Sequence, residues 1–181
     1  MKETKTIVAA VLIGTALLLG TGQGRPPAGA DFAQEYRALR ASLEAFWQRV
    51  PLLLNNVQFV RGTGNSYGIY DPRPTAAFRT GEPIYLYLEP VGYTLKKNPT
   101  GLYEFGFSAD FTVKDAAGKV LGGQTGFADL NFRSWNFNTE VALTFTYRFS
   151  GLKKGSYKVV TVVHDKFSDK RATVEQAFTI L

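Results

Sequence analysis

Residues 152–165 read LKKGSYKVVTVVHD and contain the clearest fold signal in the chain. From Tyr157 onward, the odd-numbered residues share one face of an extended segment and the even-numbered residues share the other. Successive side chains of a strand point to opposite faces, so this mostly apolar alternation predicts a β-strand over 156–165. Gly155 lies in the turn that leads into the strand.

The Leu-x-x-Gly-x-Tyr turn that begins at Leu152 resembles the tyrosine corner of immunoglobulin-like and fibronectin-type β-sandwiches. In those domains the tyrosine ring packs over the edge of the core and its hydroxyl bonds backbone a few residues upstream. The resemblance therefore implies a structural role for Tyr157. Residues 111–120 and the final run Phe178-Thr179-Ile180 also resemble parts of bacterial exported domains of this class. The resemblance covers residues 80–181 and implies an architecture without implying an activity.

Period-two patterns continue through much of the chain after Pro51. They predict seven or eight strands, at the spacing expected of an all-β sandwich. No period of 20–50 residues repeats and no linker divides the chain, so we predict one domain over 31–181. The predicted fold is a mainly β, immunoglobulin-like antiparallel β-sandwich with an N-terminal amphipathic helix. The expected strands lie at 57–61, 67–70, 84–89, 103–113, 119–121, 141–149, 156–165 and 172–181.

The leader helix is predicted over 32–50, where apolar residues recur at three- and four-residue spacing. Asp31 and Gln34 resemble a capping box, and Pro51 ends the run. One amphipathic helix cannot bury its own stripe. We expect the helix to dock across a sandwich face or an open end; the alternative is pairing with another protein or with itself. The stripe consists of Phe32, Tyr36, Leu39, Leu43, Phe46, Trp47 and Val50.

Residues 1–30 have the layout of a secretory signal peptide. Lys2 and Lys5 precede an uncharged run over 7–20, and Ala28-Gly29-Ala30 is a small-x-small cleavage signature. The run of 14 residues is shorter than the ~20 that a membrane-spanning helix needs. We therefore expect cleavage before Asp31, a periplasmic or secreted product and no stable membrane insertion, with a retained anchor as the alternative.

Composition excludes several kinds of site. The 181 residues contain no Cys and one His, His164, which leaves no disulfide framework, thiolate metal site or His-rich metal site. Residues 31–181 carry 18 basic and 14 acidic residues without a strong basic cluster, so we expect no nucleic-acid partner. We likewise expect no metal and no cofactor.

The catalytic motifs in the chain lack the context that their chemistry needs. Residues 64–68, GNSYG, match the G-x-S-x-G elbow, but the DPRP at 71–74 cannot continue as the required helix. His164 and Asp165 are adjacent on a strand and point to opposite faces. We predict no catalytic residue and a protein that is not an enzyme.

Aromatic residues in Gly-, Asn- and Pro-rich stretches are the better functional signal. Planar rings beside Asn and Arg suit stacking on sugars or packing on a protein. The competing interpretation is that residues 131–138 form another strand whose rings fill the core. We predict an exported, non-catalytic binding or structural domain of the cell envelope; the alternatives are a carboxylate-based periplasmic hydrolase and a small outer-membrane β-barrel. The candidate binding residues are Tyr67, Tyr70, Tyr93, Trp135 and Phe137, for a protein or glycan partner, and the oligomeric state stays open.

Overall fold

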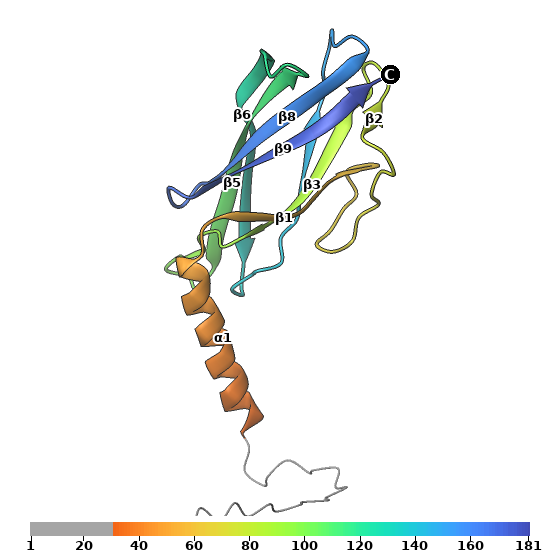
Figure 1. The fold of residues 1–181 in the computed structure, drawn as a ribbon. Coiled ribbons are helices and arrows are strands. Elements are labelled where there is room, and N and C mark those ends of the chain that lie inside the picture. Colours follow the sequence, from red (N-terminus) through yellow and green to blue (C-terminus); the bar gives the residue numbers. More distant parts are fainter. Residues whose placement is uncertain (1–30) are drawn as a thin grey trace, which may run out of the picture.

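The computed structural model describes residues 31–181, and the predicted signal peptide lies outside them. One helix, α1 (Phe32–Arg49), precedes a β-rich body (Figure 1). The helix lacks the length and hydropathy to cross a membrane. The strands are β1 (Leu53–Val60), β2 (Ala77–Phe78), β3 (Ile84–Val91), β4 (Lys96–Lys97), β5 (Tyr103–Asp115), β6 (Val120–Ser134), β7 (Leu143–Tyr147), β8 (Gly155–Asp165) and β9 (Arg171–Ile180).

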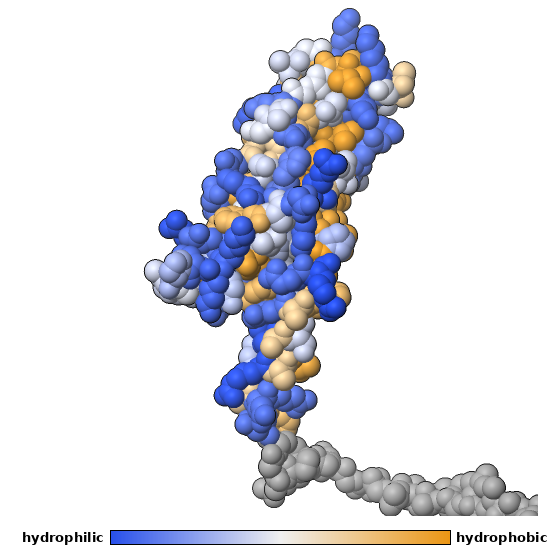
Figure 2. Space-filling model, turned by 90° about the vertical axis from the view of Figure 1, so that its left-hand side faces the viewer, coloured by the Kyte–Doolittle hydropathy of each residue, from blue (hydrophilic) through white to orange (hydrophobic). Residues whose placement is uncertain are grey.

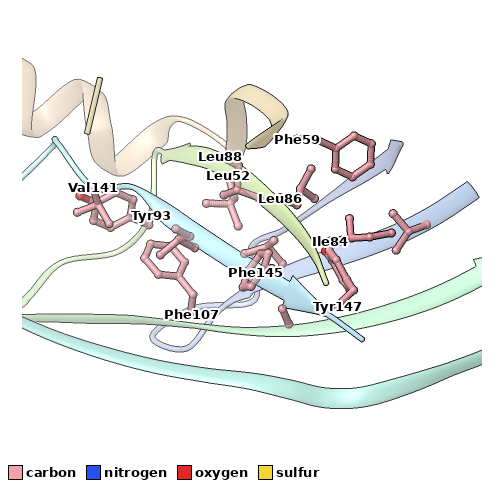
Figure 3. Close-up of a cluster of buried hydrophobic side chains, with 14 of the residues drawn as sticks. Leu52, Phe59, Ile84, Leu86, Leu88, Tyr93, Phe107, Val141, Phe145 and Tyr147 are labelled. Carbon is pink, nitrogen blue, oxygen red and sulfur yellow. The ribbon is translucent and has the colours of Figure 1, made fainter. Parts of the chain in front are cut away.

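The strands form two sheets around one shared core. The smaller sheet has the order β1-β3-β7, and the larger has the order β2-β9-β8-β5-β4, with β6 also paired to β5. All pairings are antiparallel except that of β2 with β9. Leu86 and Phe145 of the smaller sheet lie against the same cluster as Phe107 of the larger one (Figure 3). The predicted mainly β fold is confirmed, with two sheets that pack in the manner of a sandwich.

Strand β6 is much longer than the sequence pattern predicts. It runs for 15 residues, where the sequence predicts a strand at 119–121 and leaves residues 131–138 open between a strand and a loop with binding rings. Three glycines break the apolar alternation, and Gly123 is required by packing, since a Cβ there would lie 2.4 Å from the carbonyl oxygen of Phe111. Further along, the Phe132 ring stacks on Phe105 at 5.2 Å between centroids. Residues 131–134 therefore belong to a strand. By contrast, residues 67–70 form no strand, only one bridge between Ser66 and Ile69.

The hydrogen bond of the tyrosine corner is present as predicted, but Tyr157 is less buried than the largely buried side chain expected of the motif. The Tyr157 hydroxyl donates to the carbonyl oxygen of Lys153 at 2.7 Å, and its ring stacks on Phe178 at 5.6 Å. The ring is half-buried, because it covers the edge of the core. The motif thus ties the turn before β8 to the strand it begins.

Removing this hydroxyl tests the corner. We expect Tyr157→Phe to lower the free energy of unfolding by about 1 kcal/mol through the lost hydrogen bond. Tyr157→Ala should cost more, about 2–3 kcal/mol, because ring packing is lost as well. Urea midpoints measure both. Equal midpoints for wild type and Tyr157→Ala would show that the corner contributes nothing.

The expected docking of the helix is wrong. Of the predicted stripe only Trp47 is buried, while Tyr36 and Leu39 are about two-thirds exposed. Figure 1 shows α1 extending away from the end of the β-rich body. The body already closes its own core, so Trp47 is the only residue of the helix that becomes buried against it.

Candidate functional site: the projecting helix and its socket

The aromatic residues proposed from the sequence divide into two groups. Tyr93 is fully buried and Phe137 is 5% exposed, so both belong to the core and the predicted binding role is wrong for them. Trp135 is 73% exposed and Tyr67 40% exposed, on two different loops. Tyr70 is half-buried with its ring 4.2 Å from that of Tyr87. The five residues therefore do not make one binding surface.

Tyr93 and Phe137 instead build a socket for the helix. The indole N–H of Trp47 donates to the carbonyl oxygen of Tyr93 at 2.8 Å. Its ring meets those of Tyr93 and Phe137 edge-on, at 5.4 and 6.3 Å between centroids. The Tyr93 hydroxyl donates to the carbonyl oxygen of Asn138 at 2.6 Å, and burial raises the pKa of Tyr93. The Trp47 ring therefore fills the aromatic end of the core, and its indole N–H is hydrogen-bonded.

Further contacts fix the direction in which the helix leaves the body. The Lys170 ammonium donates to the carbonyl oxygens of Gly92, at 2.7 Å, and Gln48, at 3.3 Å. Gly92 has a φ of 77°, and a Cβ there would lie 2.4 Å from the carbonyl oxygen of Pro51. No other residue type fits such a backbone without strain. These contacts therefore hold the connection between α1 and β1 in one conformation.

The helix also makes a contact about two turns further out. The Arg40 guanidinium donates to the carbonyl oxygen of Phe137 at 3.1 Å. A largely polar groove of about 500 Å³ lies between Tyr36, Arg40 and residues 134–140. At the far end, the Asp31 carboxylate accepts from the N–H groups of Ala33 and Gln34 at 3.1 Å, which caps the helix. Both ends of α1 are thus defined.

Between these ends, α1 exposes a row of large apolar side chains, which we call the helix stripe. The apolar side chains of the helix lie beside charged ones, clear of the β-rich body (Figure 2). Buried and exposed positions are cleanly separated, because Trp47 faces the socket and the stripe faces outward. The helix stripe consists of Phe32 (61% exposed), Tyr36 (64%), Leu39 (65%), Leu43 (38%) and Phe46 (56%).

The GNSYG segment is fastened to the smaller sheet and does not form a nucleophile elbow. The Gly68 N–H donates to the Tyr87 hydroxyl at 3.0 Å and to the Glu89 carboxylate at 3.2 Å. Tyr87 also donates to Glu89 at 2.6 Å, and the Asn56 amide donates to its other oxygen at 2.7 Å. Burial, then the bond to Glu89, raises the pKa of Tyr87 to about 12. Glu89 thus anchors the loop that contains Ser66.

Glu89 was missed as an anchor because its partners are distant in sequence. It is 4% exposed, and its carboxylate accepts from Asn56, Gly68 and Tyr87. Alternation in β3 places it on the face opposite to Leu86 and Leu88, which predicts a solvated side chain. The loop over 61–73 covers that face.

His164 pairs across the sheet and not with its neighbour. Its Nε2 lies 2.8 Å from an Asp110 carboxylate oxygen, while the other oxygen of Asp110 accepts from the Gly126 N–H at 2.7 Å. Asp165 points the other way and accepts from Thr94 N–H and the Ser168 hydroxyl. Across residues 31–181, no group of three or more His, Cys, Asp or Glu side chains is placed to hold a metal ion.

The Asp110 pair predicts a pH dependence. The Gly126 N–H, then His164, lowers the pKa of Asp110 in the folded chain. A depressed folded pKa gives stability that is present above the unfolded value of about 4 and is lost as the pH falls through the folded pKa. Asp110→Asn should therefore flatten the loss of stability below about pH 4. Urea midpoints from pH 2 to pH 7 measure this, with Asp169→Asn as the control. Parallel curves for wild type and Asp110→Asn would contradict the assignment.

Comparison with known proteins adds little to this geometry. No protein-family model matches the sequence, and no curated protein is significantly similar to it. One similar solved structure is a superoxide reductase (neelaredoxin) from Ignicoccus hospitalis, at 8% identity and a TM-score of 0.32. The match covers 60% of this chain and 77% of the other. At this TM-score the likeness supports no conclusion about fold or activity.

Proposed function

We propose that this chain is an exported, non-catalytic interaction domain of the cell envelope, in which the β-rich body holds a helix that binds a protein partner. The observation that carries the proposal is the helix stripe on a helix whose base is locked. Trp47 and Gly92 fix the joint. The five stripe residues have no partner within residues 31–181 that buries them.

The energetics favour a partner. Each large apolar side chain that becomes buried contributes about 1.5–3 kcal/mol. Contiguous exposed apolar patches of this kind mark interaction sites in soluble proteins. An isolated helix of 18 residues is marginal in water, so most of its stability has to come from packing. Trp47 is its one buried residue, and Arg40 adds a single hydrogen bond to the body, so most of the outer helix is left to be stabilised by what it binds.

We further infer that the body belongs to the immunoglobulin-like class of sandwiches. The order β1-β3-β7 corresponds to strands A, B and E, and β9-β8-β5 corresponds to G, F and C. Tyr157 stands at the start of β8, the strand equivalent to F. Sandwiches of this class serve many unrelated functions, so the fold alone does not indicate an activity.

The surroundings of Ser66 and His164 support a non-enzymatic role. The Gly68 N–H donates to the Glu89 carboxylate and the Tyr87 hydroxyl bonds the Ser66 carbonyl oxygen, so side chains of β3 hold the Ser66 segment. The only histidine pairs with an aspartate on the face of a sheet. The export part of the proposal rests on the signal-peptide pattern of residues 1–30.

Site-specific photocrosslinking in cells tests this function. A photoreactive amino acid replaces Tyr36 on the helix stripe or Ala41 on the opposite face, both exposed. We expect discrete protein adducts from position 36 and none from position 41. No adduct from position 36, with the chain folded and exported, would overturn the proposal. So would a hydrolytic activity that His164→Gln reduces by about 100-fold, the loss expected for a general base.

A further inference from the structure

We infer that the partner of the helix stripe is a second copy of this chain, bound through a parallel two-helix coiled coil. This inference rests on the proposed function and specifies which protein binds the helix stripe. It draws on the spacing of the stripe, the charges beside it, the area it offers and the end of the helix at which the body lies.

The spacing of the stripe is that of a coiled-coil seam. Phe32, Tyr36, Leu39, Leu43 and Phe46 follow one another at intervals of four, three, four and three residues. This is the a/d pattern of a heptad repeat, with Phe32, Leu39 and Phe46 at d. A helix that packs on a sheet shows a broader apolar face. The narrow stripe therefore fits another helix with the same repeat, and an identical helix has that repeat by definition.

The charges that flank the seam are complementary in a parallel pair. Glu35 occupies position g and Arg40 position e, so Glu35 of each copy faces Arg40 of the other in the usual g-to-e′ pairing. The half-buried Arg40 guanidinium also donates to the Phe137 carbonyl oxygen through one nitrogen, and its other N–H groups can donate to Glu35 of the second copy. An antiparallel pair would instead place the two Arg40 side chains opposite each other. Residues 31–49 carry three acidic and three basic side chains, so the helix offers no net attraction for an anionic membrane.

The exposed area is sufficient for a weak but specific dimer. A buried aromatic side chain covers about 150–250 Å². At the measured exposures, the stripe offers on the order of 500 Å² per copy and about 1,000 Å² per pair, the lower bound for a specific interface. The seam extends for only two and a half heptads. We therefore expect a dimer that forms readily when the chains are concentrated.

The ends of the helix also favour the parallel orientation. The body lies at the Arg49 end of α1, and the Phe32 end is the far end in Figure 1. A parallel pair keeps both Phe32 ends away from the two bodies. An antiparallel pair with the full seam in contact would bring the Phe32 end of each helix against the body of the other copy.

Disulfide trapping tests the inference cleanly, because the chain contains no native cysteine. The full chain is made with Leu39→Cys at the seam or with Ala41→Cys on the opposite face, and each is oxidised in the cell envelope. In a parallel pair the two residues at position 39 lie at the same height within disulfide reach, so we expect at least about fivefold more covalent dimer than from Ala41→Cys. Adding Glu35→Arg should reduce this yield, whereas Glu44→Arg, away from the seam, should not.

Each contrary outcome has a separate meaning. A disulfide that forms only between co-expressed Leu39→Cys and Leu43→Cys chains would overturn the parallel orientation. Equal, low yields from Leu39→Cys and Ala41→Cys would overturn the second copy as the occupant. In that case, adducts of another mass from the photoreactive residue at position 36 would leave the proposed function standing, and their absence would remove both.

Discussion

Replacing Trp47 with Ala should lower the free energy of unfolding by about 3–5 kcal/mol, the range for a buried large aromatic residue. The substitution removes the plug from the socket of Tyr93 and Phe137 and leaves the Tyr93 carbonyl without its indole donor. The helix should then lose its fixed direction, because Trp47 is its one buried residue.

The neighbouring residue provides a matched control. Phe46 is 56% exposed on the helix stripe, so Phe46→Ala should cost the monomer less than about 1 kcal/mol. Urea midpoints followed by far-ultraviolet circular dichroism compare the two variants at low protein concentration. If Phe46→Ala were as destabilising as Trp47→Ala, the assignment of buried and exposed faces would be wrong.

Glu89→Ala should lower the free energy of unfolding by about 2–3 kcal/mol, since it removes the common acceptor of three donors and leaves the buried Tyr87 hydroxyl without that acceptor. Asn56, Gly68 and Tyr87 all donate to this carboxylate. Without it, the loop over 61–73 should detach from the smaller sheet. Limited trypsin digestion reports this directly, because Arg61 lies at the start of the loop.

Glu140→Ala is the control for that experiment, because Glu140 is an exposed carboxylate. It should leave both the urea midpoint and the rate of cleavage at Arg61 unchanged. A Glu89→Ala protein as stable and as resistant as wild type would mean that the loop is held by other contacts.

Sequence patterns predicted much of the β-rich body because burial in a sandwich imposes a period of two. The strands after Tyr157 and at 84–89 both form as expected, although β3 buries residues on both of its faces. The middle of strand β6 was missed, because Gly122, Gly123 and Gly126 interrupt the apolar alternation there. Gly123 is a strand residue beside the backbone of Phe111, a close approach that no local pattern records.

The candidate site was predicted only in part, since its decisive contacts join distant segments. Phe46 and Trp47 are adjacent and equally apolar, and nothing local says which one is buried. That choice follows from Tyr93 and Phe137, which stand in polar, glycine-rich or asparagine-rich sequence and were therefore interpreted as surface rings. The projection of the helix likewise depends on a core that closes without it.

The central claim is that the helix stripe serves binding and contributes little to the folded monomer. Its most direct test is the free energy of unfolding of the double variant Tyr36→Gln, Leu39→Gln, measured by urea denaturation at concentrations too low for self-association. Glutamine keeps a good helix propensity, so the exposed positions should lose less than about 1 kcal/mol in total. A loss of about 4 kcal/mol or more, as expected for truncating two buried side chains, would show that the helix packs on the β-rich body and would contradict the account.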